Sequence, residues 1–227
     1  MNLAIALDLP TKEENLTLLK ELKDYNIWVK VGLRSYIRDS KEFIKEIKKI
    51  NKNFKIFLDL KLYDIPNTMA DAAQEIANLD IDMFNIHASA GIEAMSEVMK
   101  RLKELPKRPL VLAVTALTSF NNESFKKVYN ANIEEKALEF AKDAYRAGLD
   151  GVVCSVYESK LIKEATSKNF LTLTPGIRPF NEDANDQKRV ATIKDAKENL
   201  VDFIVVGRPI YKANNPILKV KKILEQL

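Results

Sequence analysis

Short apolar runs rich in Val, Ile and Leu alternate along this chain with longer segments in which apolar residues recur at helical spacing. This alternation indicates repeated β-α units and a parallel sheet. The segments between the runs have lengths that suit crossover helices. The expected strands are Leu3–Asp8, Trp28–Gly32, Lys55–Lys61, Met83–His87, Leu110–Leu117, Gly151–Ser155, Leu171–Gly176 and Phe203–Gly207. The expected helices are Thr11–Tyr25, Tyr36–Ile50, Asn67–Leu79, Ile92–Leu105, Ile133–Ala147, Glu158–Ser167 and Ile217–Leu227.

An alternation of this kind predicts an α/β fold, a (β/α)8 TIM barrel, with an open doubly wound sheet as the alternative. The 227 residues, 46% of them hydrophobic, are enough for one barrel. The sequence has no Gly/Ser-rich, Pro-rich or low-complexity stretch that would mark a linker. We therefore expect a single domain over residues 1–227.

The expected third strand carries charge where a buried strand should end. Asp59 and Lys61 are two residues apart, so their side chains share one face of the strand, roughly 6 to 7 Å apart at their origins. Asp64 follows the strand, and Pro66 suits the first turn of a helix. One interpretation is a charged catalytic corner. The alternative is a solvated ion pair that contributes about 0 to 1 kcal/mol to stability.

The barrel model favours the catalytic interpretation, because barrel enzymes place their chemistry at the carboxyl ends of the strands. Polar residues from distant parts of the chain fall at these ends. They are Asp8, Lys30, Asp59, Lys61, His87, the segment Thr115–Ser119, the segment Thr174–Arg178, Gly207 and Arg208. Isolated surface charges would not need to coincide in this way.

The loops after the seventh and eighth strands of such barrels often hold a phosphate. Here they contain Gly176 to Arg178 and Gly207 to Arg208. Glycine lets the backbone approach an anion, and an arginine can contact two phosphate oxygens at once. The alternative is ordinary turn glycines with solvated arginines. We predict a phosphorylated substrate, and the polar segment Pro179–Gln187 is either a lid over the phosphate or a plain surface loop.

Composition narrows the function further. The net charge is +4, but the lysines are spread among acids and no basic stretch is interleaved with aromatic residues, which favours a small anionic substrate over nucleic acid. Cys154 is the single cysteine and is expected in the core, and His87 is the single histidine, so a zinc site has few possible ligands. The stretch Met1–Asp8 is too short for a secretory signal, and no apolar run approaches the roughly 20 residues of a membrane span. We expect a soluble, cytoplasmic protein.

Residues 59–68 read DLKLYDIPNT. Together with ALD at 6–8, VKVG at 29–32, TALTS at 115–119, PGIRP at 175–179 and VVGRPI at 205–210, this motif resembles the orotidine 5′-phosphate decarboxylase family. The resemblance spans nearly the whole chain in the right order. It implies a decarboxylase that makes uridine 5′-phosphate in the last step of de novo UMP biosynthesis, without cofactor or metal.

The resemblance also implies residue roles. Lys61 would protonate C6 of the pyrimidine, flanked by Asp59 and by Asp64, and Asp64 would come from the partner subunit of a homodimer. Lys30 and Asp59 would hold the ribose hydroxyls, with Asp8 close by. The remaining substrate contacts would be Thr118 at the pyrimidine, Arg178, Gln187, Gly207 and Arg208 at the phosphate, and Ile65 and Thr68 from the partner. The role of His87, in the motif HAS, stays open between support of the site and structure.

Two other functions are compatible with parts of this pattern. The first is a metal-dependent sugar-phosphate decarboxylase or aldolase of the same barrel type, which would need a divalent cation held by carboxylates. The second is a non-catalytic protein that binds a phosphorylated ligand, which would need no lysine between two acids. Insensitivity of the activity to EDTA would argue against the first, and turnover would argue against the second.

Overall fold

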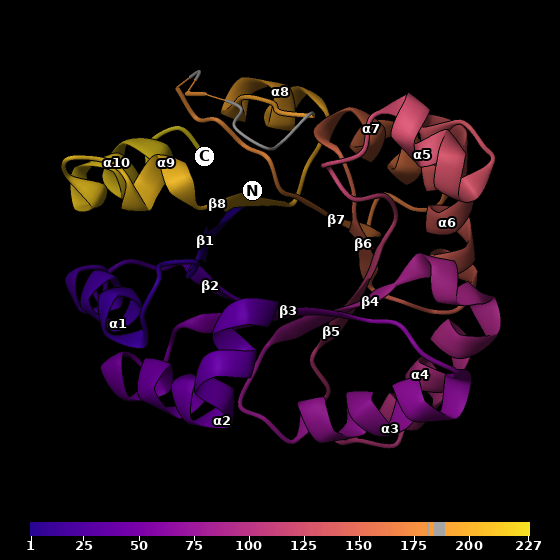
Figure 1. Cartoon of the computed structure of the whole chain (residues 1–227), viewed down its shortest axis with the longest axis horizontal. Coiled ribbons are helices and arrows are strands. Elements are labelled where there is room, and N and C mark those ends of the chain that lie inside the picture. Colours follow the sequence, from indigo (N-terminus) through magenta and orange to yellow (C-terminus); the bar gives the residue numbers. More distant parts are fainter. Residues whose placement is uncertain (181, 184–188) are drawn as a thin grey trace.

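A computed structural model, which describes residues 1–180, 182–183 and 189–227, shows a closed barrel of parallel strands in the order β1 to β8 (Figure 1). The predicted TIM barrel is confirmed, and the alternative of an open sheet is wrong, because β1 pairs with β8. The strands are β1 (Asn2–Ala6), β2 (Trp28–Gly32), β3 (Lys55–Leu62), β4 (Met83–His87), β5 (Leu110–Val114), β6 (Gly151–Val153), β7 (Leu171–Thr174) and β8 (Phe203–Val206).

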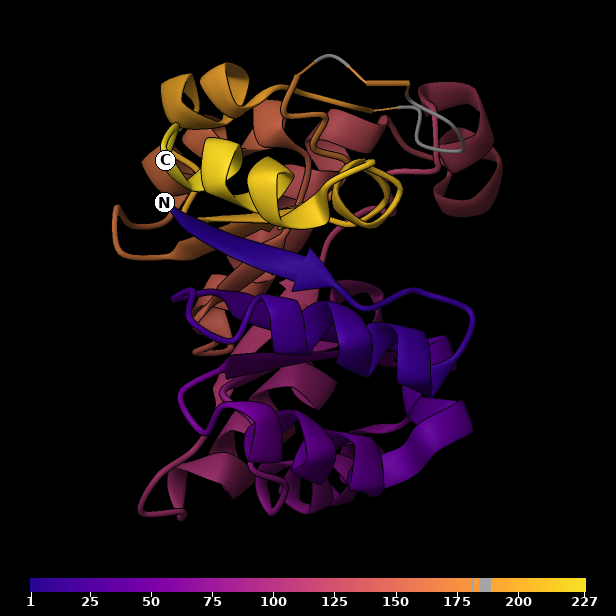
Figure 2. The ribbon, with the colours of Figure 1, turned by 90° about the vertical axis from the view of Figure 1, so that its left-hand side faces the viewer.

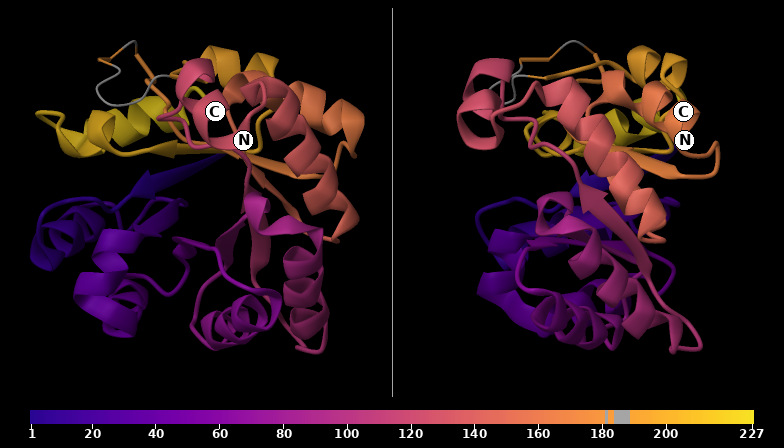
Figure 3. Two further views of the ribbon diagram at one scale, coloured as in Figure 1. Left: turned by 45° about the vertical axis from the view of Figure 1, so that its right-hand side comes forward. Right: turned by 90° about the vertical axis from the view of Figure 1, so that its right-hand side faces the viewer.

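Helices surround this barrel on the outside (Figures 1 and 3). The barrel closes where β1 lies between α1 and the helices α9 and α10 (Figure 2). No helix in the described part of the chain is long and apolar enough to cross a membrane. The helices are α1 (Lys12–Glu21), α2 (Leu33–Ile50), α3 (Pro66–Ala77), α4 (Gly91–Lys103), α5 (Asn122–Tyr129), α6 (Ile133–Arg146), α7 (Val156–Ala165), α8 (Ile193–Glu198), α9 (Arg208–Tyr211) and α10 (Pro216–Leu224), with a 3-10 turn η1 (Ala88–Ala90) before α4.

The strands bury apolar side chains on both faces, as expected for a parallel sheet covered by helices. One cluster fills the space between strands and helices and includes Cys154, as predicted from its apolar neighbours. Burial of this thiol raises its pKa well above the usual value. A second cluster fills the barrel interior, where the rings of Trp28 and Phe203 meet edge to face at 5.1 Å. Phe57 belongs to this inner cluster and also lines the cavity described below.

The amino-terminal end of the barrel carries a repeated contact that we call the aspartate clasp. An aspartate directly precedes each of β4, β6 and β8, and one of its carboxylate oxygens accepts a hydrogen bond from a backbone N–H of the preceding odd-numbered strand. The same carboxylate pairs with a lysine or arginine. The clasps are Asp82 with Ile56 (2.9 Å) and Lys55 (2.8 Å), Asp150 with Val111 (2.8 Å) and Arg108 (2.6 Å), and Asp202 with Thr172 (2.8 Å) and Lys163 (2.7 Å).

Candidate active site

A cavity of about 290 Å3 lies at the carboxyl ends of the strands, where the barrel model places chemistry. Its lining brings together most of the residues that the sequence predicts for the site, from β2, β3 and the loops after β1, β5, β7 and β8. These residues are Asp8, Lys30, Asp59, Lys61, Thr118, Arg178, Gly207 and Arg208. Apolar residues complete the lining, among them Phe57, Val114, Leu117 and Leu173. The cavity therefore combines an apolar surface with several converging charges.

Four of these side chains form a row of alternating charge across the first three strands. The Nζ atom of Lys30 lies 3.5 Å from an Asp8 oxygen and 3.4 Å from Oδ2 of Asp59. The other oxygen of Asp59, Oδ1, lies 2.6 Å from Nζ of Lys61. The predicted pairing of Asp59 and Lys61 is thus confirmed. Because Lys61 stands at the end of the row, its ammonium group borders the cavity with Asp59 on one side.

Burial and charge act against each other within this row. Burial disfavours the ionised form of Asp59, but the charges of Lys30 and Lys61 and their hydrogen bonds hold its pKa at about 2. Burial likewise disfavours the charge of Lys30, yet Asp59 and Asp8 more than offset this effect, so the pKa of Lys30 is raised. Both groups are therefore ionised at neutral pH, and the cavity keeps a fixed pattern of charge.

Strand β3 is not regular where it carries Lys61. Leu58 lies opposite Phe84 and Leu62 lies opposite Ile86, so the register between β3 and β4 shifts in between. Lys61 takes a left-handed conformation with φ of 56°, which is uncommon and unfavourable for a residue other than glycine. Strained backbone of this kind occurs at functional sites, where the surrounding structure holds it. The simple alternation expected for this strand did not reveal the irregularity.

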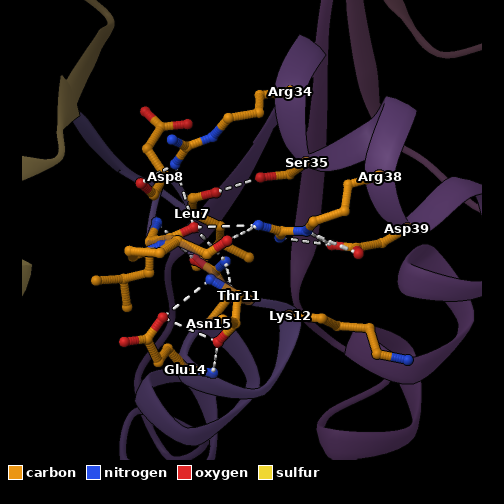
Figure 4. A network of polar contacts seen from close by, with 12 residues as sticks. Leu7, Asp8, Thr11, Lys12, Glu14, Asn15, Arg34, Ser35, Arg38 and Asp39 are labelled. Carbon is orange, nitrogen blue, oxygen red and sulfur yellow. Dashed lines mark hydrogen bonds and ion pairs between the residues drawn. The ribbon is translucent and has the colours of Figure 1, made fainter.

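The loop that carries Asp8 is held by side chains that the sequence analysis did not single out (Figure 4). The hydroxyl of Ser35 on α2 donates to the carbonyl of Leu7 at 2.8 Å. The guanidinium of Arg34 donates to the carbonyl oxygens of Asp8 and Leu9. These contacts fix the backbone at the end of β1, and so they fix the point from which the Asp8 carboxylate reaches the cavity.

Gly32 allows the first two members of the charged row to approach each other. A Cβ atom at this position would lie 3.1 Å from an Asp8 carboxylate oxygen and 3.1 Å from Nζ of Lys30. Both distances are shorter than ordinary van der Waals contact, so a side chain here would displace both groups. The glycine of the motif VKVG is thus a packing requirement of the site, and its backbone angle is an ordinary extended one.

The loops after β7 and β8 supply two further cations of the cavity lining, Arg178 and Arg208. Arg178 is buried, with 5% of its surface exposed, and its Nε donates to the carbonyl of Asp183 at 2.6 Å. Gly176 has φ of 80°, a conformation that favours glycine. Gly207 directly precedes α9, whose first residue is Arg208. Gln187, predicted at the phosphate, and part of the predicted lid Pro179–Gln187 lie outside the described residues.

One arginine beyond this segment was not predicted. Arg189 forms an ion pair with the buried carboxylate of Glu158 on α7, and its Nη2 donates to the carbonyl of Ala116 at 3.2 Å. Ala116 lies two residues before Thr118 and also lines the cavity. Arg189 therefore ties the end of the segment after β7 to the loop after β5.

The three residues predicted to act across a dimer lie outside the cavity of their own chain. Asp64 and Thr68 are exposed, and Ile65 is 67% exposed. The backbone N–H of Ile65 donates to the Asp64 carboxylate at 2.7 Å, which orients this acid beside the start of α3. Their position leaves them available to a neighbouring molecule.

His87 lies at the end of β4 and does not line the cavity. Its Nδ1 is 2.6 Å from the hydroxyl of Ser89, and its ring centroid is 5.7 Å from that of Tyr63. Burial and then the charge of Lys61 lower the pKa of the imidazole. Among the described residues, no group of three or more His, Cys, Asp or Glu side chains is arranged to hold a metal ion.

Comparisons with known proteins point to one family. A family model described as orotidine 5′-phosphate decarboxylase / HUMPS family matches residues 1–223. The chain is 70% identical over 227 residues, the full length of both chains, to the orotidine 5′-phosphate decarboxylase of a Nitratiruptor species. It is 34% identical to the orotidine 5′-phosphate decarboxylase of Lactobacillus acidophilus, whose crystal structure aligns with a TM-score of 0.85 over 99% of this chain and 98% of that one. The corresponding enzyme of Methanocaldococcus jannaschii, solved with the inhibitor BMP, is 27% identical and aligns with a TM-score of 0.80 over 100% and 98% of the chains.

Proposed function

Because this chain belongs to the orotidine 5′-phosphate decarboxylase / HUMPS family, it is a carboxy-lyase, and we propose that it converts orotidine 5′-phosphate to uridine 5′-phosphate and CO2 without a cofactor, with Lys61 as the proton donor. The observation that carries this proposal is the position of the Lys61 ammonium, at the cavity wall and 2.6 Å from the Asp59 carboxylate. A proton donor must lie within hydrogen-bond reach of the reacting atom, and Lys61 borders the space in which a substrate ring would lie.

The proposed reaction replaces a carboxylate by a proton. The bond from C6 to the carboxylate breaks, CO2 leaves as a neutral molecule, and the electron pair stays at C6. An N–H of the Lys61 ammonium then transfers its proton to C6, and the resulting amine regains a proton from solvent. Negative charge thus moves from the carboxylate toward the ammonium during the reaction, so the fixed cation is more complementary to the transition state than to the substrate.

The other lining residues are assigned to substrate binding. We place the ribose hydroxyls against Lys30 and Asp59 with Asp8 beside them, and the pyrimidine against Thr118. The phosphate would be bound by Arg178, Arg208 and the backbone at Gly207, with Gln187 as a further contact. This assignment is supported by the two arginines of the cavity lining, which come from the loops after β7 and β8, where barrels of this type often hold a phosphate. Phosphate binding would help to position the ring against Lys61.

We further propose that the active form is a homodimer in which Asp64, Ile65 and Thr68 of one subunit complete the cavity of the other. The support is their exposed position outside the cavity of their own chain, next to Tyr63, which is 64% exposed. Two large exposed apolar side chains in one short loop are typical of a contact surface. Asp64 would then lie near Lys61 of the partner as its second acid.

The loss of orotate absorbance on addition of orotidine 5′-phosphate, with EDTA present, tests the proposed chemistry. We expect turnover by the native chain and its near loss in Lys61→Ala. Binding without turnover would contradict the assignment as an enzyme. Activity that EDTA abolishes and a divalent cation restores would contradict the cofactor-free mechanism and support the metal-dependent alternative. Full activity of Lys61→Ala would exclude Lys61 as the donor.

A further inference from the structure

Asn85, in the middle of β4, is a buried polar residue to which neither the motifs nor the cavity lining assigns a role. Its side chain has no exposed surface. It does not line the cavity, so it cannot touch a bound substrate. Buried side-chain amides are retained only with hydrogen-bond partners, and the partners of Asn85 are the two central residues of the site. We infer that Asn85 is a positioning residue that holds Lys61 and Asp59 in their reactive arrangement.

The first contact concerns the backbone of Lys61. Because Leu58 lies opposite Phe84 and Leu62 opposite Ile86, the three residues 59–61 of β3 face Asn85 alone on β4. The regular backbone hydrogen bonds between β3 and β4 therefore cannot pair every N–H and C=O group of these three residues. The backbone N–H of Lys61 donates instead to Oδ1 of the Asn85 side chain at 2.8 Å. The amide thus replaces a missing ladder partner at the residue with the left-handed backbone, φ of 56°.

The second contact concerns the carboxylate of Asp59. Nδ2 of Asn85 donates to Oδ1 of Asp59 at 2.7 Å, and this oxygen also accepts the 2.6 Å hydrogen bond from Lys61 Nζ. The orientation of the amide is fixed by chemistry, since an N–H can only donate and an ionised carboxylate can only accept. Asn85 therefore uses one end for the Lys61 backbone and the other for the acid that orients the Lys61 ammonium.

This arrangement links the strained backbone to the position of the reactive nitrogen. If Asn85 is truncated, the Lys61 N–H and one Asp59 lone pair lose their buried partner, and the left-handed turn loses a contact that holds it. The expected consequence is a displaced ammonium. A misplacement of the order of 1 Å can reduce a rate by about 100-fold. Because Asn85 does not touch the substrate, kcat should fall much more than KM should rise.

The inference rests on the proposed role of Lys61, so Lys61→Ala is measured in parallel. We expect Asn85→Ala to lower kcat by about 100-fold with a small change in KM. Ser159→Ala is the matched control, because Ser159 is also fully buried and hydrogen bonded, to Thr172 at 2.8 Å, but lies between α7 and β7 outside the cavity lining. A loss of kcat in Asn85→Ala no larger than in Ser159→Ala would overturn the inference. Full activity of Lys61→Ala would instead overturn the proposed function.

A second variant, Asn85→Asp, separates positioning from packing and is nearly the same size, so it guards against a failure of Asn85→Ala to fold. The introduced carboxyl accepts from the Lys61 N–H in either form, but it donates to Asp59 only when protonated. The charged groups beside Asp59 are Lys30 on β2 and Lys61 on β3. Asp8, in the loop after β1, pairs with Lys30, and the charge of Lys61 lowers the pKa of His87 on β4 after the larger effect of burial. We expect the kcat of Asn85→Asp, relative to the native chain, to rise as the pH falls. A constant ratio across the pH range would contradict the inferred hydrogen bond to Asp59.

Discussion

The Nζ atom of Lys61 lies 2.6 Å from Oδ1 of Asp59, although the two residues are separated on β3 by only one residue and Lys61 has a left-handed backbone. The ion pair therefore coincides with an irregularity in the strand. An unfavourable backbone conformation costs of the order of 1 to 3 kcal/mol and persists only where other contacts fix it. Here the contacts include Asn85 and, through Asp59, the buried Lys30.

The acid stability of the protein should depend on Asp59. Its pKa is lowered from 3.8 to about 2, so its ionised form contributes to stability fully above about pH 4, and this contribution is lost as the pH falls toward 2. Its size is of the order of 2 kcal/mol. Urea unfolding of the native chain and of Asp59→Asn between pH 2 and about 6 should show a smaller acid dependence in the variant. Parallel curves would contradict the low pKa.

Replacement by alanine should affect substrate binding at Gly32 and stability at Gly151. Gly32→Ala would displace the charged ends of the Asp8 and Lys30 side chains, so we expect KM to rise by up to about tenfold with little loss of stability. Gly151→Ala would place its Cβ 2.2 Å from the backbone oxygen of Leu171, so we expect a loss of about 1 to 3 kcal/mol. Steady-state kinetics and urea unfolding of both variants distinguish the cases. An unchanged KM in Gly32→Ala would show that the two side chains can move aside freely.

The single histidine provides a direct probe of charge at the site. Burial and the charge of Lys61 lower the pKa of His87 below 6.5, so the stability that it contributes is complete above about pH 6.5 and is lost as the pH falls through the lowered pKa. NMR titration of the imidazole should show one transition below 6.5. In Lys61→Ala this transition should move upward, because a neighbouring cation is removed. Glu123→Ala changes an exposed charge on α5 and serves as the control, with no shift expected.

Hybrid dimers test the proposed sharing of the site. Lys61→Ala and Asp64→Ala should each be inactive alone. If subunits exchange freely, half of the dimers in an equal mixture are hybrids with one intact site, so about one quarter of the native activity should return. Orotate absorbance before and after subunit exchange measures this recovery. A mixture that stays inactive although mass spectrometry shows hybrids would contradict the assignment of Asp64 to the partner's site.

The aspartate clasps should support stability rather than activity. In Asp202→Asn the buried Lys163 loses its carboxylate partner at 2.7 Å, and the backbone N–H of Thr172 retains only an amide oxygen. We expect a loss of about 1 to 3 kcal/mol in urea unfolding, since a buried charge is left unpaired. The kcat and KM should be unchanged, because the clasp lies at the end of the barrel opposite the cavity. A change in kcat would indicate coupling between the two ends.

Much of the barrel could be predicted because strand beginnings are marked by apolar runs. Strand ends were predicted less well. The fifth strand was expected over Leu110–Leu117, but β5 ends at Val114. Ala116 and Leu117 extend the apolar run because they line the cavity. Helices α5, α8 and α9 were not predicted. For α5 and α8 a signal existed in the capping boxes of Asn121 with Ser124 and of Thr192 with Asp195.

The charged row of the site could be predicted, because each member lies at or just after the carboxyl-terminal part of a strand and belongs to a recognisable motif. The residues that hold the row were missed, because they act from buried or distant positions. Asn85 had one visible signal, a polar residue inside the apolar strand Met83–His87. Arg34 had none, since its contacts are with backbone carbonyl oxygens of the loop after β1, which no side-chain pattern shows.

The clasps also divide the barrel into units. Each clasp joins an odd-numbered strand to the even-numbered strand that follows. Among the described residues, none of the three clasps joins β4 to β5 or β6 to β7. A fragment from Arg108 to the end of β6 keeps the Asp150 clasp within itself, and a fragment from the start of α7 to the end of β8 keeps the Asp202 clasp. Places where the chain could be split, permuted or exchanged with another barrel should therefore alternate along the sequence. Recombination after α4, or between β6 and α7, would preserve every clasp. Recombination between β3 and β4 would take Asp82 from one parent and Ile56 and Lys55 from the other, so this clasp would have to form between two different parents.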